Sequence, residues 1–241
     1  MDAQEAATAT GKAIGAIGGS FMLDGETYKR GAELGFQGFD FYAAGRGGVL
    51  GDVDADVVAA AFTFFEPGNV RTNWDLGRSV MSPAEAATAW AGCCAAWADA
   101  HVPDDLDAAG LAGLLDEVVR TARPACAVVF SGWRALEVPT GAKAHAVHQV
   151  NALRELRNGL HGAAVIAAGL TPHEAVSLNS PQMAALFGWS ELADTEGLRP
   201  RWDAAEAATN AAMAHAFAGL DDAGRDRVAE LTNALHRATS G

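Results

Sequence analysis

The sequence predicts a mainly α-helical protein. Alanine is abundant along all 241 residues, valine and isoleucine are sparse, and no stretch of useful length alternates apolar and polar residues as a half-buried strand would. Strong helix starts are also present, because Ser82 and Thr171 are each followed directly by proline and, three residues on, by the glutamate of a capping box. Half of the residues are hydrophobic, so the chain can bury a substantial core.

The N-terminal half is expected to contain helices separated by glycine and proline breaks. Met1 to Ala9 is expected to be a loose lead-in, and Glu66-Pro67-Gly68 is expected to stop a helix and leave Trp74 and Arg78 in a turn region. The expected helical segments are 13–35 (one or two helices), 54–65, 83–100, 106–122 and 125–134.

The turn Val138-Pro139-Thr140-Gly141 is the expected boundary between an N-terminal half, 1–139, and a C-terminal part, 140–241. A long helix over 144–170 should begin the second part, and Gly169 should help to end it. The helices expected after it cover 171–178, 180–187, a start at Trp189, 202–217 and 225–238.

The helix expected over 144–170 carries a dense set of ionisable side chains. With 3.6 residues per turn, Arg154, Arg157 and His161 share one narrow sector beside an apolar stripe, so they should be half-buried. Half-buried guanidinium groups need partners, which leaves two readings open: an internal salt-bridge network between the two halves, or an anionic or carbonyl-bearing ligand. The carboxylates considered for the network are Glu155, Glu174 and Asp40.

In the ligand reading, a pocket between the two halves binds a small, partly aromatic or anionic organic molecule, for sensing, sequestration or specialised metabolism. Arg154 and Arg157 would hold ligand oxygen atoms by forked hydrogen bonds, and His161 would donate a hydrogen bond or exchange a proton. The glycine-rich segment 35–51 would add Arg46 as a third cation. The expected aromatic walls are Phe39, Tyr42, Phe62, Phe65 and Trp74.

The alternative is a cofactor-independent enzyme, in which His161 performs acid-base chemistry while Arg154 and Arg157 stabilise developing negative charge. The sequence has no phosphate-binding loop and no G-x-S-x-G elbow. No metal site is expected. The weak candidates His145, His148 and Glu155 lie on the opposite sector of the same helix, where solvated side chains are the favoured interpretation. A histidine-ligated haem or another cofactor stays open.

The charge balance predicts which partners are excluded. The formal net charge is −13 and only three residues are lysine, so the acidic field should repel phosphate backbones and anionic lipids. Nucleic-acid and membrane partners are therefore not expected, and no apolar segment has the length of a membrane span. Three cysteines without a disulfide or metal spacing, and a start without a secretory leader, favour a cytoplasmic location.

Several motifs occur in the order found in one protein family. They are GFDFYAAGRGGVLG (38–51), AAFTFFEP (60–67), RELRNGLHGAA (154–164), GWS (188–190) and DDAGRDRVAELT (221–232). Together they resemble an actinobacterial helix-turn-helix family of about this length, and the resemblance extends from about Gly31 to Ala238. It implies a winged-helix-like C-terminal part, with 202–217 as recognition helix and 220–224 in place of the wing. The hairpin is cut to a few residues here, so the wing is reduced, and Leu156 replaces a commoner histidine.

Transcriptional regulation is the third reading, and it is implied by this resemblance. A recognition helix usually presents arginine, lysine or amide side chains to bases. The 202–217 helix has no lysine or arginine, and 191–237 holds nine acidic against five basic residues. We therefore expect the winged-helix-like part to serve packing or formation of a homodimer.

Overall fold

The computed structural model describes residues 1–240, and these form twelve α-helices and three short 3₁₀ helices without a strand. This confirms the mainly α fold class. The α-helices are α1 (Ala3–Ser20), α2 (Gly25–Glu33), α3 (Phe39–Gly47), α4 (Ala55–Ala61), α5 (Pro67–Val80), α6 (Pro83–His101), α7 (Ala108–Thr121), α8 (Val128–Arg134), α9 (Ala142–Ala167), α10 (Pro172–Asn179), α11 (Arg199–Phe217) and α12 (Asp222–Thr239), and the 3₁₀ helices are η1 (Phe21–Leu23), η2 (Gly48–Leu50) and η3 (Pro181–Met183).

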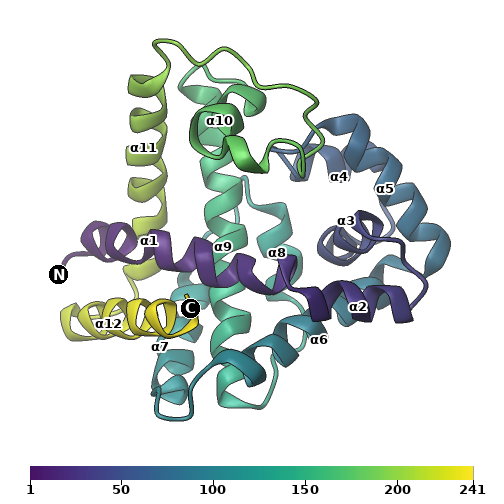
Figure 1. Ribbon diagram of the computed structural model, residues 1–241. Coiled ribbons are helices and arrows are strands. Elements are labelled where there is room, and N and C mark those ends of the chain that lie inside the picture. The colour runs from purple at the N-terminus through teal and green to yellow at the C-terminus, as the bar shows by residue number, and fades with distance from the viewer. Residues whose placement is uncertain (241) are drawn as a thin grey trace.

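The long helix α9 is the centre of the fold. It packs against α1, α6, α7, α8 and α11, while α3 to α6 form a group to one side of it (Figure 1). Helix α11 lies beside α9, and α1 crosses α9 and packs on α12 as well. The main hydrophobic core draws on helices from α1 to α12, and a smaller cluster joins the end of α9 to α10 and the start of α11. A central helix covered on most sides explains why its polar side chains are buried.

Helix α1 approaches α9 closely because of its glycines. A Cβ atom added at Gly18 would lie 2.8 Å from Cβ of Arg154, and one added at Gly11 would lie 3.2 Å from Nε of Arg157. Glycine at both positions therefore lets the stem of Arg154 and the guanidinium group of Arg157 lie directly on the α1 backbone. At Gly15, between them, an added Cβ atom would meet no heavy atom within 4 Å.

Two expectations for the N-terminal half are wrong. Met1 to Ala9 is not a loose lead-in, because α1 begins at Ala3 and a capping box between Asp2 and Glu5 fixes its start. Trp74 and Arg78 do not lie in a turn, since they belong to α5. In that helix Pro67 occupies the first turn, and the carboxylate of Glu66 accepts a hydrogen bond from the backbone N–H of Asn69. Proline at that place begins a helix, because the N–H group it lacks has no partner there in any case.

In the C-terminal part the long central helix is confirmed, but two expected helices are absent. The segment 180–187 forms η3 and turns, and no helix opens at Trp189, whose indole instead donates a hydrogen bond to the carbonyl of Phe64. A short turn joins α11 to α12 where the wing was expected, and residues 1–240 contain no strand, so the winged-helix detail is not confirmed. The boundary at residue 139 stays a prediction.

No helix in the described part of the chain combines the length and the apolar character that a membrane crossing requires. All three cysteines are free thiols.

Candidate functional site

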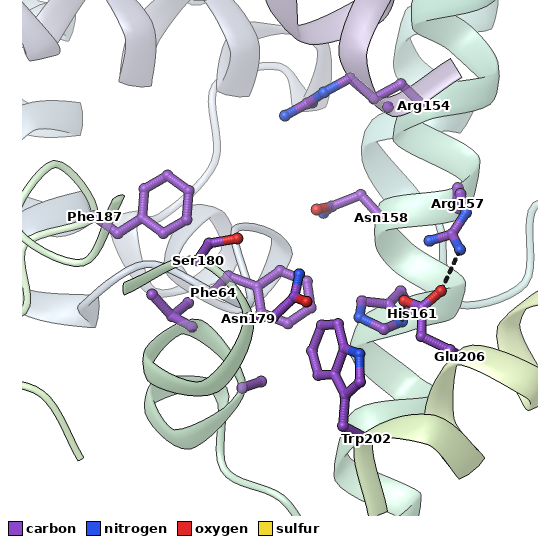
Figure 2. Close-up of a pocket in the computed structure, with 13 residues that line it drawn as sticks. Phe64, Arg154, Arg157, Asn158, His161, Asn179, Ser180, Phe187, Trp202 and Glu206 are labelled. Atoms are coloured by element: carbon purple, nitrogen blue, oxygen red, sulfur yellow. Dashed lines mark hydrogen bonds and ion pairs between the residues drawn. The ribbon is translucent and has the colours of Figure 1, made fainter. Parts of the chain in front are cut away.

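A cleft opens between α9, α10 and α11, and its cavity measures about 310 Å³. Figure 2 shows it from within, with His161 beside Trp202 and Phe64, and with Arg154 reaching across from the opposite end. The side chains or backbone of these residues line it: Gly15, Phe64, Arg154, Arg157, Asn158, His161, Ala175, Val176, Asn179, Ser180, Phe187, Trp202 and Glu206. The three residues that the sequence placed in one sector of α9 therefore face the same cavity.

Arg157 joins α9 to α11 at the wall of the cleft. Its Nη2 donates to Oε2 of Glu206 over 2.8 Å and to Oδ1 of Asn210 over 3.3 Å. The pair is partly buried, and Nε of Arg157 has no hydrogen-bond partner within residues 1–240. The charge of this guanidinium is therefore balanced by the protein itself.

Helix α11 also binds His161, which is a neutral imidazole. Its Nδ1 lies 2.9 Å from Oγ1 of Thr209 and 3.4 Å from Oε1 of Glu206. The Thr209 hydroxyl already donates to the carbonyl of Ala205, so it accepts from Nδ1–H, which leaves Nε2 as a lone-pair acceptor. Burial lowers the pKa of His161 to about 4; Glu206 opposes this decrease and Arg157 adds to it.

The second arginine of the cleft, Arg154, belongs to a buried network. Glu155 accepts from Nε and Nη2 of Arg46 at 2.9 and 2.7 Å, and from Nη1 of Arg154 at 2.6 Å. Burial alone would raise the pKa of Glu155, but the charges and hydrogen bonds of the two arginines outweigh it and lower that pKa. One carboxylate thus accepts hydrogen bonds from two guanidinium groups, and of the two arginines Arg154 is the one that lines the cavity.

An apolar sub-pocket of about 80 Å³ adjoins the cleft, with which it shares Arg154 and Phe187. Phe39 stacks on Tyr42 with ring centroids 4.9 Å apart, and Phe65 packs on Phe187 at 4.3 Å. Three of the five expected aromatic wall residues, Phe39, Tyr42 and Phe65, therefore line this sub-pocket.

The other predicted ligand contacts lie elsewhere. Arg46 is fully buried between Glu155 and the ring of Phe62, whose centroid is 4.3 Å from the guanidinium carbon, and neither residue lines the cleft. Trp74 is a core residue whose indole N–H donates to the carbonyl of Val53. Arg46, Phe62 and Trp74 therefore make their contacts in the internal ionic network and the hydrophobic core, and not in the cleft.

The weak metal candidates do not converge. His145 lies 2.7 Å from Asp116, His148 is buried against the ring of Trp133, and Glu155 binds arginines. Within residues 1–240 no group of three or more histidine, cysteine or acidic side chains could hold a metal ion. Burial of His148 is explained by the packing of α8 onto that sector of α9.

Several lining residues were not predicted, among them Phe64, Phe187 and Trp202. They come from three separate segments, so no periodicity in the sequence connects them. Trp202 carried one usable signal, since it is the large apolar residue in the first turn of an alanine-rich helix. Acid-base catalysis by His161 stays a prediction.

A family model described as a helix-turn-helix family matches residues 7–207. No curated protein and no solved structure matches. The expectation that nucleic acid is not a partner is wrong in the light of this match, since such families include DNA-binding proteins; net charge describes the whole surface and not a local one. Actinobacterial origin stays a prediction.

Proposed function

This chain belongs to the helix-turn-helix family, and from that premise we propose that it is a transcriptional regulator that binds DNA. The observation that carries the proposal is the family match over most of the chain. A regulator of this kind acts where the DNA is, which in the expected actinobacterial host is the cytoplasm.

The helix-turn-helix unit that we propose is α9, the turn 168–171 and α10. DNA-binding units of this type join two helices by a turn of three or four residues that often contains glycine. Here the turn has four residues, and Gly169 adopts a φ of +78°. Thr171 and Glu174 then form a capping box that starts α10. The whole unit lies inside the matched range.

Two arginines of α11 flank this unit and supply positive charge for phosphates. Nη1 of Arg201 donates to the carbonyl of Gly169 over 3.0 Å, and Nη2 of Arg199 donates to the carbonyl of Leu178 over 3.4 Å. Both side chains are exposed, and within residues 1–240 their hydrogen bonds go to backbone carbonyls and not to carboxylates. Each can therefore bind a phosphate without first leaving an ion pair.

The cleft suits an effector site for such a regulator. Its walls include Val176 and Asn179 of α10 and Trp202 of α11, so a bound molecule would contact both the second helix of the unit and the helix that carries the arginines. A ligand that prefers one placement of α10 shifts the population toward that placement, and with it the affinity for DNA. We propose that a small organic molecule regulates DNA binding in this way.

DNA binding can be tested by selection from a random duplex library, followed by fluorescence anisotropy with the enriched sequence. The double variant Arg199→Gln/Arg201→Gln should bind at least about tenfold more weakly, and the slope of log affinity against log salt should fall by about 2, because two phosphate contacts are lost.

The matched control is Arg120→Gln/Arg227→Gln, which changes the net charge equally on α7 and α12 and should leave affinity near that of the parent. Failure of the parent to retain any duplex at low salt would overturn the proposed function. Equal losses of DNA affinity in both double variants would show that the net charge of the protein, and not this helix-turn-helix unit, determines binding.

A further inference from the structure

The positive and negative charges of the side chains around the cleft do not sum to zero. Five ionic side chains lie in the cleft wall or directly behind it, three arginines and two glutamates, and His161 is neutral. The arginines are Arg46, Arg154 and Arg157, and the glutamates are Glu155 and Glu206. The cluster therefore carries one uncompensated positive charge.

That charge is located at Arg154. Arg46 and Glu155 form a bidentate pair that is completely buried, and Arg157 is balanced by Glu206. Arg154 uses Nη1 for its bond to Glu155, while the residue lines both the cleft and the sub-pocket. Figure 2 shows this side chain extending over the cavity, away from the Arg157–Glu206 pair. Its remaining N–H donors suit the fork of a carboxylate.

Besides the polar side chains of Asn158, Asn179 and Ser180, the cleft has three aromatic side chains that suit a flat apolar body. Phe64 and Trp202 stand at one end of the cavity and Phe187 at the other, next to the aromatic sub-pocket. The ring of Trp202 lies edge-on to His161, with centroids 5.0 Å apart. A volume of about 310 Å³ is at the small end of organic ligand sites, which usually measure roughly 300–1,000 Å³.

We propose that the ligand of this cleft is an aromatic monocarboxylate of one or two rings, with its carboxylate on Arg154 and its rings between Phe187 and Trp202. This proposal specifies the effector of the proposed regulator, so it rests on that function for its biological role. A dianion exceeds the single positive charge available, and a neutral amide leaves that charge unpaired. Both should therefore bind more weakly than the monoanion.

The test is calorimetric titration of the full chain with four probes: naphthoate, naphthamide, naphthalenedicarboxylate and octanoate. Naphthoate should bind at least about tenfold more tightly than each of the others, because a charge-assisted hydrogen bond and ring packing are both needed. Arg154→Gln should abolish the preference for naphthoate over naphthamide. Tighter binding of octanoate or naphthamide than of naphthoate would overturn the proposal, as would the absence of binding heat with naphthoate at millimolar concentration.

Gly15 offers a variant that blocks the cavity without touching its charges. Gly15 lines the cleft, has open space at its Cβ position and lies within α1, where phenylalanine favours helix formation more than glycine does. Gly15→Phe should remove naphthoate binding and keep the melting temperature. The control Gly113→Phe, at an open helical glycine of α7, should bind naphthoate like the parent. Binding that survives Gly15→Phe would place the site elsewhere and contradict the proposal.

The two proposals can fail separately. Naphthoate binding to a chain that retains no duplex would overturn the regulator and leave the ligand class standing. DNA binding without naphthoate binding would overturn only the ligand class.

Discussion

Replacing Glu155 with alanine should lower the free energy of unfolding by about 3–5 kcal/mol, the usual cost of removing one partner of a buried ion pair. The side chains of Arg46 and Glu155 have exposed fractions of 2% and 0%. Without the carboxylate, Arg46 would stay in the core beside the rings of Tyr42 and Phe62, and its ion pair would be lost. Urea unfolding followed by circular dichroism measures the loss.

Two comparisons make this result specific. Glu33→Ala removes an exposed partner of Arg30 and should cost less than about 1 kcal/mol. The double variant Arg46→Met/Glu155→Met should recover most of the stability, since apolar residues of similar size can replace a buried pair. A Glu155→Ala protein as stable as Glu33→Ala would show that solvent or another group already compensates Arg46.

The sequence predicted the side of α9 on which the cleft lies, because helical periodicity depends only on local spacing. Arg154, Arg157 and His161 face one cavity as that spacing requires. Their partners could not be chosen by the same means. Glu155 was one of three carboxylates considered, and the long stem of Arg154 lets it reach the residue next to it in sequence while Arg46 arrives from α3.

Tertiary packing decided what local patterns could not. The polar side of α9 that carries His148 was interpreted as solvated, but α8 covers it and leaves His148 with an exposed fraction of 1%. The cavity wall likewise depends on Phe187 and Trp202, which meet only after the chain has folded around α9. Periodicity shows that a face exists, and the neighbouring helices determine what covers it.

Burial of His148 leads to the second large effect, which is a loss of stability in acid. Burial lowers its pKa to about 4; His145 adds to this decrease and Asp116 opposes it. In the unfolded chain the same imidazole titrates near its ordinary pKa, 6.5, so the unfolded state takes up the proton first. The stability contributed by the neutral ring is complete above pH 6.5 and is lost as pH falls toward 4. At pH 5 the loss is about 2 kcal/mol, and His161, shifted in the same direction, should add about as much.

His148→Leu should therefore reduce the difference in unfolding free energy between pH 8 and pH 5 by about half of the histidine contribution. It should also stabilise the protein at pH 8, because neither ring nitrogen of His148 has a hydrogen-bond partner within residues 1–240 and leucine removes both polar atoms. His215→Leu provides the control, since it makes the same substitution at a histidine that is exposed in the folded protein. An unchanged pH dependence of the unfolding free energy in His148→Leu would contradict this prediction. It would mean that the His148 imidazole takes up its proton equally readily in the folded protein, so water would have to reach the ring beside Trp133.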